Sequence, residues 1–170
     1  SEKHSSALDF CTRGRSVSTI FGDGAGAVIL QPTEDENRGI LSTHLHSDGI
    51  GAESLSVFNP GSHANHWKEG LANYDEADFG LQYVNKAMID DAKIFPVMDG
   101  NAVMKRAITK LPEVIHEALA ANNKTPEDID MLILNQSNLR IAEFVQKKLE
   151  LTDDEVFTNI QRYGNTTAAS

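Results

Sequence analysis

Helical and strand patterns alternate along the part of the chain that begins at Gly100, and this order constrains the fold more than any other feature. Residues 100–123 repeat apolar side chains at the spacing of an amphipathic helix, and residues 139–151 do so again. The apolar run 131–134 predicts a buried strand, and 156–160 predicts the last strand. Because alternating strands and helices pack as layers, the sequence predicts an α/β fold.

The two helical patterns also predict which side chains face the core. The first helix should bury one stripe and, after it, a short helix should begin at Thr125 with a proline in its first turn. The expected stripe is Met104, Ala107, Ile108, Leu111, Val114, Ile115, Ala118 and Leu119. In the second helix the expected inward residues are Ile141, Ala142, Val145 and Leu149.

Amide side chains follow both C-terminal strands. Asn135 ends the run "LILN", and Asn165 lies in the turn "RYGNTT" after the next strand. Sites in α/β sheets form beyond the carboxyl ends of the strands, so we expect Asn135 and Asn165 to converge on one site. The alternative is structural, because asparagine is also a common turn former and helix cap.

Charge and composition exclude several classes of partner. Lys plus Arg number 15 against 25 for Asp plus Glu, a net charge of −10, which argues against nucleic acid or an anionic membrane as the main partner. An anionic partner would need a local basic patch, for which Lys105, Arg106 and Lys110 are candidates if they are not simply solvated. One cysteine, Cys11, excludes an internal disulfide framework and fits a reducing cytosol.

The N-terminal part contains two motifs that suggest binding sites and fail on context. Residues 17–21 and 27–30 predict strands joined by "GDGAG", and its glycines match a relaxed dinucleotide motif that lacks the required helix. We interpret these glycines as a place where backbone passes close to backbone or to a catalytic centre. His44 and His46 share one face of a predicted strand but have no third ligand at metal-binding spacing, so no metal site is predicted.

Two stretches of the sequence bear on domain organisation. The charged stretch "PTEDENRG" at 32–39 is the best candidate boundary, and residues 59–95 show an irregular, insertion-like pattern. Both ends of the chain interrupt a pattern, so we expect an internal segment of a longer protein.

Five motifs in order then resemble a known family. These motifs are "FGDGAGAVIL", "GILSTHLHSDG", "MDGNAVMKRAI", "LNQSNLRIAE" and "RYGNTTAAS". The chain resembles the 3-oxoacyl-[acyl-carrier-protein] synthase III family, thiolase-fold condensing enzymes with αβαβα layers. The resemblance implies that residues 1–35 end the N-terminal half and that 36–170 are most of the C-terminal half.

The resemblance also implies an acyltransferase chemistry with a Cys–His–Asn set. An acyl group passes from acyl-CoA to a cysteine, and malonyl-[acyl carrier protein] loses CO₂ and attacks it, while histidine and asparagine donate to the thioester oxygen. The family's asparagine corresponds to Asn165, and its histidine corresponds to Asn135, which can donate but cannot carry a proton. The reacting cysteine belongs to a part of the family's N-terminal half that this chain lacks, so Cys11 is not expected to take its place.

Other positions transfer from the family one by one. Gly100 and Asn101 resemble residues near the coenzyme A pantetheine arm, Arg15 one near the adenine, and Asn138 a site-supporting asparagine. The positions that resemble the carrier-protein docking surface are Lys105, Arg140, Lys147 and Lys148.

The implied protein is a cytoplasmic homodimer of fatty-acid biosynthesis with acyl-CoA and malonyl-[acyl carrier protein] as partners. It uses coenzyme A thioesters as substrates, with no further cofactor, no metal, no nucleic acid and no membrane. The alternative is a thiolase-fold paralogue, non-catalytic or altered in its reaction, that keeps the carrier surface. A replaced cysteine in the absent half would favour this alternative.

Overall fold

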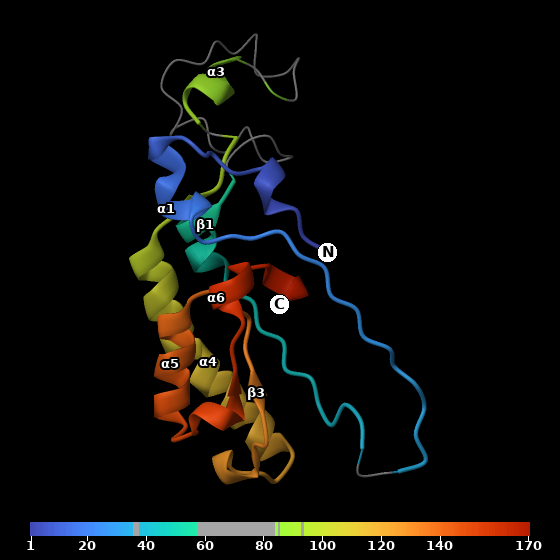
Figure 1. The fold of residues 1–170 in the computed structure, drawn as a ribbon. Coiled ribbons are helices and arrows are strands. Elements are labelled where there is room, and N and C mark those ends of the chain that lie inside the picture. The colour runs from blue at the N-terminus through green and yellow to red at the C-terminus, as the bar shows by residue number, and fades with distance from the viewer. Residues whose placement is uncertain (36–37, 58–83, 85, 93) are drawn as a thin grey trace.

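A computed structural model of the chain describes residues 1–35, 38–57, 84, 86–92 and 94–170. In these residues the fold is built around two packed helices, α4 (Gly100–Ala121) and α5 (Leu139–Lys148), which lie side by side in Figure 1. The predicted region 59–95 falls mostly outside the described residues, which there include the short helix α3 (Lys86–Asp90).

The core forms where α5 packs on α4 and on the strand between them. The buried side chains of this cluster are Leu134, Ile141, Ala142, Val145 and Leu149, so all four predicted inward positions of α5 are confirmed. The α4 stripe supplies Met104, Ala107, Ile108, Leu111 and Ile115, which are partly buried against the same cluster. The amphipathic spacing therefore predicted the packed faces of both helices, because burial of one apolar stripe stabilises each helix.

Helix ends follow the sequence signals. Asp99 caps α4 by accepting from the backbone N–H groups of Asn101 and Ala102, and Asn138 caps α5 by accepting from Arg140. The short helix predicted after Thr125 is a 3-10 turn, Pro126–Asp128, with a capping box. α4 continues through Pro112, which is buried.

Two small sheets hold the strands. β3 (Leu132–Ile133) pairs in parallel with β4 (Val156–Phe157), with Leu132 opposite Val156, and β1 (Leu55–Ser56) pairs antiparallel with β2 (Val97–Met98). The strand predicted at 131–134 is confirmed at 132–133. Its predicted burial holds only in part, because Ile133 is 66% exposed whereas Leu134, directly after β3, is 8% exposed.

Three strand predictions in the N-terminal part are wrong. Residues 15–18 form the short helix α1 (Arg15–Ser18), and neither 27–30 nor 40–46 belongs to a strand. Figure 1 shows residues 27–35 leading away from the body as an extended segment and residues 38–48 leading back to it. A strand needs a neighbour for its backbone hydrogen bonds, and the described residues give these two runs none.

Arg13 makes an ion pair within the N-terminal turn and a hydrogen bond that links this turn to α3. Arg13 bonds the carboxylate of Asp9 at 2.7 Å and donates to the carbonyl of Asp90 in α3. The hydrogen bond from Arg13, followed by that from the Cys11 backbone N–H, holds the pKa of Asp9 below its usual range. Cys11 is exposed and begins a 3-10 turn, Thr12–Gly14. No helix among the described residues is long and apolar enough to cross a bilayer.

Candidate functional site

The two predicted amides lie in the turns that leave neighbouring parallel strands. Asn135 follows β3, and Asn165 follows β4 and the short helix α6 (Ile160–Tyr163). Because β3 and β4 run parallel, their carboxyl ends meet at one edge of the sheet. Asn135 therefore lies at that edge, whereas Asn165 comes only after α6, and the convergence of the two amides on one site stays a prediction.

Asn165 is held firmly. Its side chain is 5% exposed, and its Oδ1 accepts from the backbone N–H of Thr167 at 2.9 Å. Its backbone N–H donates to Ile20, and its carbonyl accepts from Gly22. Because Oδ1 is occupied by a donor, the side-chain amide is oriented with Nδ2 as its available donor group.

The glycine-rich turn of the N-terminal part seats Asn165. A Cβ at Gly22 would lie 1.9 Å from the Tyr163 carbonyl oxygen, and a Cβ at Gly164, where φ is +69°, would lie 2.9 Å from the Ile20 carbonyl oxygen. Glycine is needed at both positions because backbone passes against backbone there. This confirms the interpretation of "GDGAG" as a close-approach turn.

Polar atoms near this turn lack partners in the described part of the chain. Thr167 Oγ1 and Asn159 Oδ1, in the segments on either side of Asn165, are buried without a hydrogen-bond partner there. Buried polar groups are nearly always satisfied in native proteins, so each of these two atoms has hydrogen-bonding capacity that the described residues leave unused.

Asn135 differs from Asn165 in burial. Its side chain is exposed, and its carbonyl accepts from the Ser137 N–H in a tight turn. The neighbouring Gln136 is the buried amide, 4% exposed, and it hydrogen-bonds to both turns. Sequence reasoning missed Gln136, although the two-residue alternation of a strand assigns it to the face of the buried Leu134.

The remaining predicted positions are distributed over the helix starts. Gly100 and Asn101 begin α4 directly after β2, and Arg15 begins α1, which packs against β2. All three are exposed. Arg15 thus begins a helix that packs on the strand before α4, and the assignment of these three residues to coenzyme A stays a prediction.

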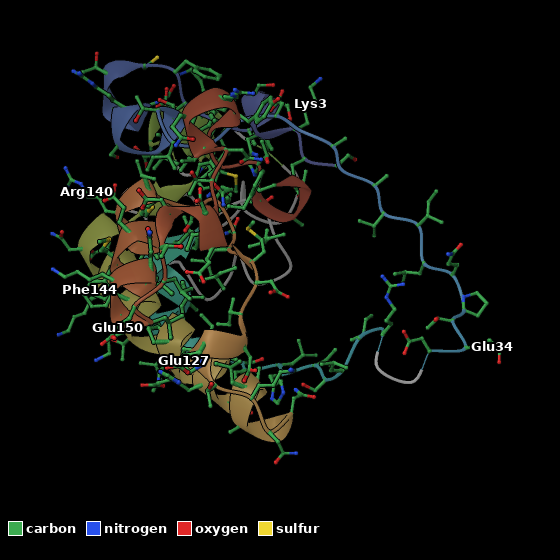
Figure 2. The ribbon with its side chains drawn as sticks, turned by 60° about the horizontal axis from the view of Figure 1, so that its bottom comes forward. Lys3, Glu34, Glu127, Arg140, Phe144 and Glu150 are labelled. Carbon is green, nitrogen blue, oxygen red and sulfur yellow. The ribbon has the colours of Figure 1, made fainter. Side chains whose placement is uncertain are left out.

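The predicted docking residues are exposed on α4 and α5. Lys105 lies near the start of α4, Arg140 in the first turn of α5, and Lys147 and Lys148 in its last turn. Figure 2 shows Arg140 and Phe144 on the same outer side of α5, directed away from the body. Arg106, next to Lys105 on α4, forms an ion pair with Asp48.

His44 and His46 contact one carboxylate rather than a metal. Glu117 on α4 accepts from Nδ1 of His44 at 3.0 Å and from Nε2 of His46 at 2.8 Å, each through a different oxygen. Among the described residues, no group of three His, Cys, Asp or Glu side chains is arranged to hold a metal ion. The two histidines attach the segment before Asp48 to α4.

Comparison with known proteins gives one consistent result. Residues 1–49 match the family model "3-Oxoacyl-[acyl-carrier-protein (ACP)] synthase III", and residues 119–170 match the model of its C-terminal part. The chain is 33% identical over 99% of its length to Beta-ketoacyl-[acyl-carrier-protein] synthase III of Chlorobium phaeobacteroides and 40% identical over 92% to that of Enterobacter sp. strain 638. It spans 46% and 41% of these two relatives' lengths.

Solved structures agree. The chain resembles 3-oxoacyl-(acyl carrier protein) synthase III from Pseudomonas aeruginosa PAO1 with a TM-score of 0.71 and 30% identity, covering 98% of this chain and 43% of that one. The enzyme from Thermus thermophilus gives a TM-score of 0.68 at 27% identity, covering 98% of this chain and 44% of that one. The α/β fold is thus that of the thiolase-like enzymes, while the domain boundary near residue 35 and the site residues stay predictions.

Proposed function

Because this chain belongs to the 3-oxoacyl-[acyl-carrier-protein] synthase III family, we propose that the protein containing it is an acyltransferase that condenses an acyl group from acyl-CoA with malonyl-[acyl carrier protein]. The observation that carries the proposal is Asn165, buried beyond a parallel strand with Oδ1 fixed by Thr167 and Nδ2 available to donate. Such a fixed donor suits a thioester oxygen on which negative charge develops.

In the proposed reaction, a cysteine outside this chain receives the acyl group. Decarboxylation of the malonyl thioester then leaves an enolate whose carbon attacks the acyl thioester, forming the new carbon–carbon bond and releasing the cysteine thiolate. Asn165 stabilises the enolate oxygen through Nδ2, and Asn135 is the second donor. Asn135 can supply a hydrogen bond there but no proton.

Partners follow from the same proposal. Acyl-CoA is assigned to Arg15, Gly100 and Asn101, with Asn138 supporting the site. The carrier protein is assigned to the basic surface formed by Lys105, Arg140, Lys147 and Lys148. We further propose a cytoplasmic homodimer in fatty-acid biosynthesis that needs no cofactor beyond its coenzyme A thioester substrates.

The test uses the full-length protein with radiolabelled acetyl-CoA, a longer acyl-CoA as second primer, and malonyl-[acyl carrier protein]. We expect labelled 3-oxoacyl product, and Asn165→Asp should lower kcat by about 10²- to 10³-fold, because a donor is replaced by an acceptor. Asn123→Asp, on an exposed turn, is the matched control and should have no such effect.

Asn135 favours a second candidate, a non-catalytic paralogue that retains the carrier surface. That protein would bind carrier protein but form neither acyl-enzyme nor product with either primer. Cys11→Ser is a control for the proposed enzyme, because replacing an exposed cysteine outside the amide site should leave its activity unchanged. Loss of acyl labelling in that variant would overturn the assignment of the nucleophile to another part of the protein.

A further inference from the structure

The turn after β3, residues 135–138, and the turn after β4, residues 157–160, are joined by one buried side chain. Gln136, in the first turn, is 4% exposed, and its side chain hydrogen-bonds to the backbone of Leu134, just before this turn, and to the backbone of the second turn. Nothing in the function proposed above uses Gln136, so its burial and its contacts call for an account of their own.

The amide of Gln136 makes four hydrogen bonds to backbone. Nε2 donates to the carbonyl of Leu134 at 2.9 Å and to that of Phe157 at 3.3 Å. Oε1 accepts from the N–H groups of Asn159 at 2.9 Å and Ile160 at 3.3 Å. The side chain therefore bonds the carbonyl of the residue after β3, the last carbonyl of β4 and the N–H groups at the start of α6.

These bonds fix more than local structure. α6 runs from Ile160 to Tyr163 and leads directly into Gly164 and Asn165. The N–H groups that donate to Gln136 therefore lie at the start of the element that precedes Asn165. The backbone of Gln136 continues without a break from Asn135. One side chain thus determines how the Asn135 turn sits relative to the start of the Asn165 element.

We propose that Gln136 is a positioning residue that keeps the side-chain donors of Asn135 and Asn165 in register at one substrate oxygen. This inference rests on the proposed function. Two donors that act on one developing charge must hold their separation, since a misplacement of ~1 Å can cost ~10²-fold in rate. Gln136 achieves this by hydrogen-bonding to the backbone, without touching the substrate.

Two substitutions in the full-length protein separate positioning from folding. Gln136→Met keeps the volume and removes all four bonds. Gln136→Glu keeps an acceptor for Asn159 and Ile160 but turns a carboxylate oxygen toward the carbonyls of Leu134 and Phe157. Gln161→Glu, the same chemical change on the exposed side of α6, is the matched control.

Hydrogen exchange gives the structural readout. The N–H groups of Asn159 and Ile160 should lose protection in Gln136→Met and keep it in Gln161→Glu. Unchanged protection of these two amides in Gln136→Met would overturn the proposal at its first step.

Kinetics gives the functional readout, with kcat expressed per acylated site so that unfolded protein does not count. We expect kcat in Gln136→Met to fall by ~10²-fold with KM for malonyl-[acyl carrier protein] changed less than threefold. In Gln136→Glu the rate should recover as the pH falls, because a buried carboxyl protonates readily and its O–H can donate again. A kcat per acylated site within twofold of the parent in Gln136→Met would mean a purely structural role.

A parent protein that makes no product would defeat the proposed function, and the inference would then be decided by NMR. The side-chain NH₂ signals of Asn135 and Asn165 should both shift in Gln136→Met and stay in place in Gln161→Glu. Unmoved signals in Gln136→Met would overturn the positioning role.

Discussion

At the scale of single residues, Asn135 and Asn165 have the same side chain in opposite environments. Asn165 is buried and its amide is oriented by Thr167, whereas Asn135 is exposed and its side chain has no hydrogen bond to the described residues. The resemblance assigns Asn135 to the position of a histidine. An exposed amide at a strand end leaves space for the larger imidazole, so the position can be tested by restoring it.

Asn135→His in the full-length protein should raise the rates of malonyl decarboxylation and condensation by roughly tenfold or more, because a titratable donor returns to the strand end. The rate should also depend on pH, with a midpoint at the ordinary histidine pKa of about 6.5. Steady-state assays from pH 5 to 8 measure both effects. Asn123→His controls for a new surface histidine, and an equal or lower rate in Asn135→His would mean that the site serves another reaction.

At the scale of elements, the segment 42–48 is fastened to α4 by a polar network. Asn122 donates to Ser42, whose hydroxyl bonds Nε2 of His44, while Nδ1 of His44 donates to Glu117. The Asp48–Arg106 ion pair fastens the end of the same segment.

The carboxylate of Glu117 makes this attachment dependent on pH. Hydrogen bonds from His44 and then His46 lower the pKa of Glu117 below its ordinary 4.5. A carboxyl whose pKa is lower in the folded state stabilises that state above its unfolded pKa, and the contribution disappears as the pH falls through the folded value. The attachment is therefore complete at neutral pH and weakens in acid below pH 4.5.

Glu117→Gln should loosen the attachment of residues 42–48 to α4 at pH 7, because the charge-assisted bonds from His44 and His46 become neutral ones. The difference from the parent should vanish at pH values below the pKa of Glu117. NMR order parameters of the backbone in residues 42–48, compared with the parent at both pH values, measure how firmly the segment is attached. Glu113→Gln, one turn earlier on α4 and paired with Lys110, should leave the segment unchanged. A difference that persists in strong acid would contradict the account.

At the scale of the whole molecule, the net negative charge opposes an anionic partner, so docking of such a partner depends on a local basic surface. The chain carries a net charge of −10, yet Arg140, Lys147 and Lys148 are exposed on one helix, and Phe144 beside them is 42% exposed. The two lysines also stabilise α5 itself, since cations favour a helix C-terminus. A binding experiment is needed to separate this structural role from docking.

Charge reversal of Arg140, Lys147 and Lys148 to Glu should weaken binding of the carrier protein by about tenfold or more, since exposed ion pairs contribute ~0.2–1 kcal/mol each. Added salt should weaken binding of the parent as well. Titration calorimetry measures both Kd values. Reversal of the exposed Lys3, Arg38 and Lys124 to Glu makes the same change in net charge elsewhere and is the control. Equal weakening in both triple variants would show that net charge, and not a docking surface, governs binding.

The sequence by itself determined the elements whose stability is local. The stripe Ile141, Ala142, Val145 and Leu149 is set by helical spacing, the caps at Asp99 and Asn138 act within two or three residues, and the order of motifs is enough to identify the family.

Tertiary structure decided what depends on distant partners. Residues 27–30 and 40–46 have strand-like composition, but a strand exists only where another strand accepts its hydrogen bonds. The same holds at the candidate site, where Asn135 and Gln136 are adjacent amides in the sequence. Gln136 became the buried link because the carbonyl of Phe157 and the N–H groups of Asn159 and Ile160 meet it across the sheet, a contact over more than twenty residues that no local pattern encodes.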